Sequence, residues 1–88
     1  MYELHITKAL DKLFRKLAKK DSKQLDIILK KAGEVAHNPN RYKNLRNPLQ
    51  HLKRVHIDSS FVLLFTVDDQ EKIVTLIDYD HHDNIYKS

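Results

Sequence analysis

The sequence predicts an α+β fold in which an N-terminal helical hairpin packs on an antiparallel sheet of three to four strands. Apolar residues repeat at helical spacing up to residue 36, and the period changes to two after residue 54. Short turn-forming segments then separate three apolar runs, and strands joined by short turns pair antiparallel. A chain of 88 residues has room for a single domain, residues 1–88, around one modest core.

Two consecutive helices form the expected hairpin. The first should begin after Thr7, a residue type that commonly caps helix N-termini. The second should begin at Asp21, which together with Gln24 resembles a capping box. It should end at Asn38, because the residue before Pro39 is pushed out of the helical region. The apolar stripes expected to face the sheet are Leu10, Leu13, Phe14 and Leu17, then Leu25, Ile28, Leu29, Ala32, Val35 and Ala36.

Four segments have the pattern of strands. Residues 2–6 alternate weakly and could form a short first strand. Val55 and Ile57 alternate with polar residues, which indicates a half-buried strand. Residues 61–67 are apolar on both faces, as in a central strand, and residues 73–77 form the last strand, which runs on towards Tyr79.

The charges are divided unevenly along the chain, although the net charge is only +4. Residues 1–54 carry 14 Lys and Arg against 5 Asp and Glu, whereas residues 55–88 carry 2 against 7. A basic surface attracts polyanions such as nucleic acids, because each neutralised phosphate releases condensed counterions. The alternative is a lysine-rich surface that is simply solvated.

Several classes of protein are excluded by composition. The absence of cysteine excludes disulfide scaffolds, thiolate metal sites and cysteine nucleophiles. The N-terminus lacks the apolar core of a signal peptide, and the longest apolar run is far too short to span a membrane. We therefore expect a cytoplasmic protein without a membrane partner.

Two polar clusters could carry chemistry. Arg54, His56 and Asp58 alternate along one strand and should share a face. They follow a basic segment that contains Arg46, His51 and Lys53.

The second cluster, residues 80–83, reads Asp-His-His-Asp and is closed by Tyr86. Metal-free RNA cleavage needs a base, an acid and cations that stabilise the phosphorane, and histidines beside Arg and Lys supply all three. The alternative is that these histidines are ordinary surface groups. His81 and His82 with their flanking aspartates could also bind a divalent metal adventitiously. Adjacent strand residues point to opposite faces, so we expect no defined two-histidine metal site and no cofactor.

Two motifs resemble those of the RelE/ParE toxin superfamily, and the resemblance runs over essentially the whole chain. The first is Arg54-Val55-His56-Ile57, followed after a turn by residues 61–65. The second is the C-terminal His81-His82-Asp83-Asn84-Ile85-Tyr86. Within the superfamily, the sequence is similar to the histidine-bearing, YafQ-like branch. It departs from that branch at Asn47 and Ser60, although His51 and Asp58 lie nearby in the sequence.

The resemblance implies a toxin of a type II toxin–antitoxin system that enters the ribosome and cuts messenger RNA without a metal. It also implies an acidic RelB-like antitoxin that binds the toxin in a hetero-oligomer. A gyrase inhibitor of the ParE type and a degenerate nucleic-acid-binding homologue are the alternatives. The catalytic residues implied are His56, His82, Tyr86 and Arg54, and the RNA-binding residues are Arg46, His51, Lys53, Asp58 and His81.

Overall fold

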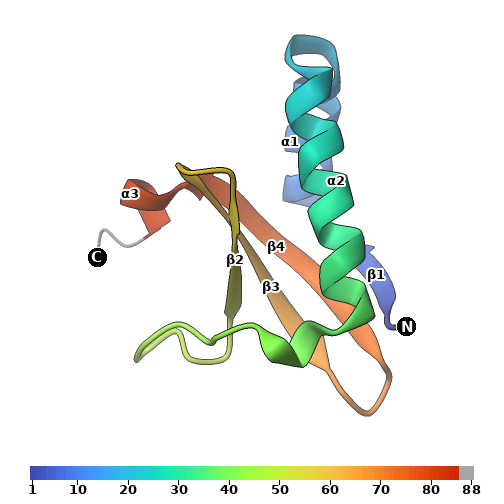
Figure 1. Cartoon of the computed structure of the whole chain (residues 1–88), viewed down its shortest axis with the longest axis vertical. Coiled ribbons are helices and arrows are strands. Elements are labelled where there is room, and N and C mark those ends of the chain that lie inside the picture. The colour runs from blue at the N-terminus through green and yellow to red at the C-terminus, as the bar shows by residue number, and fades with distance from the viewer. Residues whose placement is uncertain (86–88) are drawn as a thin grey trace.

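The computed structural model describes residues 1–85, in which two helices lie against one face of a four-stranded sheet (Figure 1). This arrangement confirms the expected α+β architecture. In chain order, the elements are β1 (Glu3–Ile6), α1 (Lys8–Lys20), α2 (Ser22–His37), the 3-10 turn η1 (Pro39–Arg41), β2 (Lys53–Ile57), β3 (Phe61–Asp68), β4 (Ile73–His81) and the short α3 (His82–Ile85).

The helix starts are fixed by side-chain caps, as expected from the sequence. The hydroxyl of Thr7 accepts a hydrogen bond from the backbone N–H of Leu10, and the carboxylate of Asp21 accepts one from the N–H of Gln24. The second half of the capping box is missing, because the Gln24 amide instead donates to the hydroxyl of Tyr79 at 2.7 Å. Gln24 therefore ties α2 to the sheet rather than to its own cap.

The sheet has the strand order β1-β4-β3-β2 and is mixed. Strands β2, β3 and β4 pair antiparallel, as their short turns require. The expectation of a fully antiparallel sheet is corrected at β1, which pairs parallel with β4. The physical reason is connectivity: the whole helical hairpin, rather than a tight turn, follows β1, so nothing forces β1 to reverse direction relative to its neighbour.

The larger core lies between the helices and the sheet. Leu10 and Phe14 of α1 and Ile28, Ala32 and Val35 of α2 are buried in it. Leu13 and Leu29 were expected in this core but remain about two-fifths exposed. Both lie at the rim of their helical stripes, where the sheet no longer covers them.

A smaller apolar cluster covers part of the opposite face of the sheet. It combines Val62 and Leu64 of β3 with Leu45 and Leu52 from the connecting segment and Ile85 from α3. In Figure 1, α3 and the segment between η1 and β2 lie at opposite ends of this face, away from the helical hairpin. We call this side, which the hairpin does not cover, the open face.

A β-bulge in β4 determines which residues reach the open face. Leu64 pairs with Asp78 but Phe65 pairs with Leu76, so Ile77 has no partner in β3. Before the bulge, Val74 and Leu76 point to the helices, and after it Tyr79 does. The shift turns Asp78 and the following even-numbered positions of the strand to the open face.

Among residues 1–85, no helix combines the length and the apolar character that crossing a bilayer demands.

Candidate active site

Two cross-strand rows of residues form the polar part of the open face. In the first row, His56 pairs with Val62, which pairs with Asp80. In the second, Arg54 pairs with Leu64, which pairs with Asp78. Basic side chains on β2 and carboxylates on β4 therefore flank a central apolar strand, and a phosphate group would be attracted to the β2 side, where Arg54 lies.

His82 lies at the same end of the sheet as His56. Its backbone N–H donates to the carbonyl oxygen of Ser60, in the turn between β2 and β3, at 2.9 Å. Neighbouring strands lie about 4.8 Å apart, so β2 and β4 are separated by about 10 Å at the row that contains His56 and Asp80.

Asp83 lies beside the imidazole of His82. Its Oδ1 atom is 3.1 Å from Nδ1 of His82, and the His82 side chain is 43% exposed. This contact is an ion pair when the imidazole is protonated, and it helps to hold the orientation of the ring. The Nδ1 side of the His82 ring therefore faces Asp83.

A chain of aromatic rings connects this end of the sheet to the larger core. Tyr79 stacks on Phe61 with ring centroids 5.1 Å apart, and the edge of Phe61 meets His81 at 5.6 Å. His81 in turn stacks on His82 at 4.7 Å. The position of the His82 ring is therefore supported by contacts that begin in the buried core.

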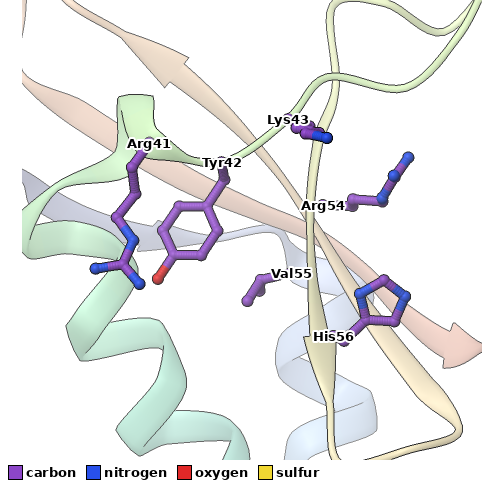
Figure 2. A pocket seen from close by; sticks show the side chains of 6 residues that line it. All are labelled: Arg41, Tyr42, Lys43, Arg54, Val55 and His56. Atoms are coloured by element: carbon purple, nitrogen blue, oxygen red, sulfur yellow. The ribbon is translucent and has the colours of Figure 1, made fainter.

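A hollow of about 400 Å³ surrounds the outer edge of β2 (Figure 2). Arg54 and His56 point to one side of the strand, whereas Val55 points to the other. The guanidinium of Arg41 lies 5.2 Å from the ring centre of Tyr42. The lining offers cations for phosphate and an aromatic ring for a base, and it consists of Arg41, Tyr42, Lys43, Arg54, Val55 and His56.

The sequence analysis did not single out three of these residues, Arg41, Tyr42 and Lys43. Asp83, which it noted only as part of a motif, was also not assigned a role. The run Arg-Tyr-Lys at residues 41–43 combines positive charge with an aromatic ring, a pattern from which a nucleic-acid-binding segment could have been predicted. The sequence could not predict that these residues approach β2, because the approach depends on a hydrogen bond from the Arg54 N–H to the Lys43 carbonyl oxygen.

The other expected RNA-binding residues have different surroundings. Arg46 and His51 are exposed in the segment between η1 and β2. The ammonium of Lys53 donates to the carbonyl of Tyr42 and to Oδ1 of Asn44, both at 2.9 Å. Lys53 therefore braces this segment, and one of its three N–H groups is left for a phosphate.

The expectation that Asp58 shares a face with Arg54 and His56 is wrong. Strand β2 ends at Ile57, and Asp58 adopts a positive φ of 48° in the turn. Its carboxylate accepts hydrogen bonds from the N–H of Ser60 and from the amide of Gln24 on α2. Asp58 is thus a turn residue directed towards the hairpin. Tyr86, expected in the catalytic set, lies outside the described residues.

The expectation that His81 and His82 point apart is also wrong. It assumed that both lie on a strand, but β4 ends at His81 and α3 begins at His82. The change to helical geometry brings the two rings side by side, with 27° between their planes. His81 therefore contacts His82 directly and is placed to influence it.

Solved structures with this arrangement define the class of protein. The chain superimposes on a structure of the toxin–antitoxin complex RelBE2 from Mycobacterium tuberculosis with a TM-score of 0.78 and 24% identity, covering 91% of this chain and 90% of the other. It superimposes on isolated RelE toxin from E. coli with a TM-score of 0.74 and 25% identity, covering 92% and 84%. The fold is that of small RelE-type toxins.

Sequence comparison then gives the family. Residues 4–86 match the profile of the family described as ParE toxin of type II toxin–antitoxin system, parDE. A protein of Methanocaldococcus jannaschii that is named as a candidate toxin, RelE4, is 60% identical over 87 residues, which cover 99% of this chain and 93% of the relative. The chain belongs to the RelE/ParE superfamily of toxins from type II toxin–antitoxin systems. The resemblance drawn from its two motifs is thereby confirmed.

Proposed function

We propose that this toxin is a ribosome-dependent endoribonuclease that cleaves messenger RNA in the ribosomal A site and so inhibits translation. The observation that carries the proposal is the pair His56 and His82, two histidines at the same end of the sheet, beside a basic strand edge. The same pair of histidines favours the YafQ-like branch of the superfamily. The proposed substrate implies that the protein acts in the cytoplasm.

The chemistry proposed is metal-free acid–base catalysis. His56 removes the proton from the RNA 2′-hydroxyl, and the 2′-oxygen forms a bond to phosphorus. The bond between phosphorus and the 5′-oxygen breaks, and His82 supplies the proton that this oxygen takes up. The products are a 2′,3′-cyclic phosphate and a free 5′-hydroxyl.

The surrounding cations and aromatic groups complete the proposed site. Arg54 stabilises the charge that builds up on the phosphorane. Arg46 and the remaining N–H of Lys53 hold neighbouring phosphates, and His51 and His81 line the RNA path. Tyr86 stacks on an unpaired base, a device common in the recognition of single-stranded RNA.

The proposed partner is an acidic, RelB-like antitoxin that neutralises the toxin in a hetero-oligomer. The toxin in the M. tuberculosis structure is complexed with its antitoxin. In this chain, the excess of Lys and Arg in residues 1–54 is suited to an acidic partner. Charge complementarity of this kind speeds association.

The test is tightly induced expression, followed by primer extension on ribosome-bound messenger RNA. We expect new cuts within translated codons, reduced at least about tenfold by His82→Ala and by His56→Ala, since a positioned acid or base contributes about 10²–10⁴-fold. The matched control is His37→Ala, which removes an exposed imidazole at the end of α2. Cleavage that continues undiminished in both site variants would contradict the assignment.

One alternative has a specific observation in its favour, because the matching family profile is described as a ParE toxin. A gyrase inhibitor of that type would arrest growth and inhibit DNA supercoiling while leaving ribosome-bound messenger RNA whole. A degenerate homologue would bind RNA with strong salt dependence, cut nothing and cause no arrest.

A further inference from the structure

The junction between β4 and α3 brings together three side chains that can each donate a ligand atom to a metal ion. They are His81, His82 and Asp83, and one ligand atom from each lies within 4.8 Å of the others. Among residues 1–85, these three residues form the group of histidine and acidic side chains whose ligand atoms lie close enough together to hold a metal ion. Their proximity results from the helical turn that replaces the expected strand.

The ligand atoms converge rather than merely lie near one another. Oδ1 of Asp83 is 3.1 Å from Nδ1 of His82, and Oδ2 is 3.6 Å from Nδ1 of His81. The Nδ1 atom of His81 also accepts a hydrogen bond from the backbone N–H of Asp83 at 3.2 Å. In this arrangement Nδ1 of His81 carries a lone pair, which is the form that a metal ion requires.

Apart from the bond from the Asp83 N–H to His81, the backbone around the cluster is also held by hydrogen bonds that do not use the ligand atoms. The carboxylate of Asp80 accepts from the backbone N–H of His81 at 2.7 Å and from the side-chain amide of Asn84 at 3.0 Å. The backbone N–H of His82 is bonded to Ser60. The three ligand side chains are 39%, 43% and 74% exposed, in sequence order, so an ion from solution can reach them.

We propose that His81, His82 and Asp83 bind a divalent transition-metal ion of the class that prefers imidazole, with Zn²⁺ as the representative. Two nitrogens and one carboxylate oxygen suit Zn²⁺, whereas Mg²⁺ and Ca²⁺ prefer oxygen ligands throughout. Ligands of a tetrahedral Zn²⁺ ion lie roughly 3.3 Å apart, given bonds of about 2.1 Å. The largest separation in the cluster, up to 4.8 Å, therefore needs to contract by about 1.5 Å, and the fourth position is left to water.

The ion inhibits the toxin, a consequence that rests on the nuclease function proposed above. The ion would occupy His82, the residue that the proposed mechanism places at the leaving 5′-oxygen. A His82 ring held by the ion is no longer available to that oxygen. Zn²⁺ is thus expected to act as an inhibitor that competes with catalysis and not as a cofactor.

The binding test uses the full chain without a histidine tag and Zn²⁺ alone as the probe, in competition with a chromophoric chelator. We expect one equivalent bound per chain. His81→Ala and Asp83→Asn should each lower the affinity at least about tenfold, since even outer-shell partners contribute that much. His51→Ala and His37→Ala remove imidazoles elsewhere and should leave the affinity unchanged. Equal affinity in all these variants would identify an adventitious ion only and overturn the proposal.

A second measurement avoids variants altogether. In NMR spectra of the histidine rings of the unaltered chain, the first equivalent of Zn²⁺ should shift the resonances of His81 and His82 and leave those of His5 and His51 in place. Shifts confined to His5 or His51 would overturn the site, whether or not any variant folds.

Cleavage assays then separate the two proposals. If the chain binds Zn²⁺ at these residues but cuts no ribosome-bound RNA, the nuclease function fails and the metal site stands. If the chain cuts RNA and binds no Zn²⁺, the metal site fails. If both proposals hold, Zn²⁺ should suppress cleavage and a chelator should restore it. Zn²⁺ should reduce the cleavage rate of His81→Ala by a smaller factor than that of the unaltered chain, each compared with its own metal-free rate. Unaltered cleavage by the Zn²⁺-loaded chain would overturn the inhibitory role.

Discussion

Tyr79 shows how the fold perturbs a single residue. Its side chain is mostly buried between α2 and the sheet, where it stacks on Phe61. Burial raises the pKa of Tyr79 above its ordinary value of 10.0. The hydrogen bond from Gln24 acts in the opposite direction, and the carboxylates of Asp58 and Asp21 raise the pKa further. The folded chain therefore holds this proton more tightly than the unfolded chain.

The raised pKa of Tyr79 predicts a loss of stability in alkali. The contribution of protonated Tyr79 to the free energy of unfolding is complete below the pKa of Tyr79 in the unfolded chain, near 10.0. It is lost as the pH rises through the higher pKa of Tyr79 in the folded chain. The free energy of unfolding should fall more steeply above about pH 10 in the wild type than in Tyr79→Phe. Urea unfolding at a series of pH values measures this, and parallel curves for the two proteins would refute the prediction.

At the scale of single residues, the sequence predicted positions well when the role was local. Thr7 and Asp21 cap their helices because a cap needs only a side chain and the N–H groups that follow it. Asp58 and His82 were misplaced, because each lies one residue beyond the end of a strand. Where a strand ends determines on which side the next side chain lies, and strand ends are weakly marked in sequence.

At the scale of elements, α2 offers a matched pair of neighbouring isoleucines. Ile28 is 0% exposed in the larger core, whereas Ile27 is 45% exposed. Ile28→Ala should lower the free energy of unfolding by about 2–5 kcal/mol, since it leaves a cavity under the sheet. Ile27→Ala should change it by less than about 0.5 kcal/mol, as is usual for surface substitutions. Urea denaturation compares the two, and equal losses would mean that α2 packs through a different face.

The helices were more predictable than the sheet. A stripe of apolar residues at helical spacing identifies α1 and α2, although it could not show that Leu13 and Leu29 remain partly exposed. The parallel pairing of β1 and the bulge at Ile77 had no local mark in the sequence. Both depend on partners distant in the chain, because strand pairing is decided by the segment that lies alongside.

At the scale of the whole molecule, the division of charge predicts how RNA binding responds to salt. Each phosphate neutralised on single-stranded RNA contributes about 0.7 to the slope of log K against log salt concentration. Arg54→Gln, on the open face, should lower this slope by about that amount. Lys16→Gln, an equal charge change on the exposed surface of α1, should not. Titrations with 2′-O-methylated RNA avoid cleavage, and equal slopes for the two variants would argue against binding at β2.

The sequence alone determined the fold class, the helical hairpin, the three antiparallel strands and the superfamily. These follow from apolar periodicity, caps, turns and two motifs, all of which are written in neighbouring residues. Only the tertiary structure decided how the site is assembled. The approach of residues 41–43 to β2, the transfer of Asp78 and Asp80 to the open face, and the meeting of His81, His82 and Asp83 all depend on it. Each depends on strand register and on the residue at which a strand ends, and both are fixed by packing between segments far apart in the chain.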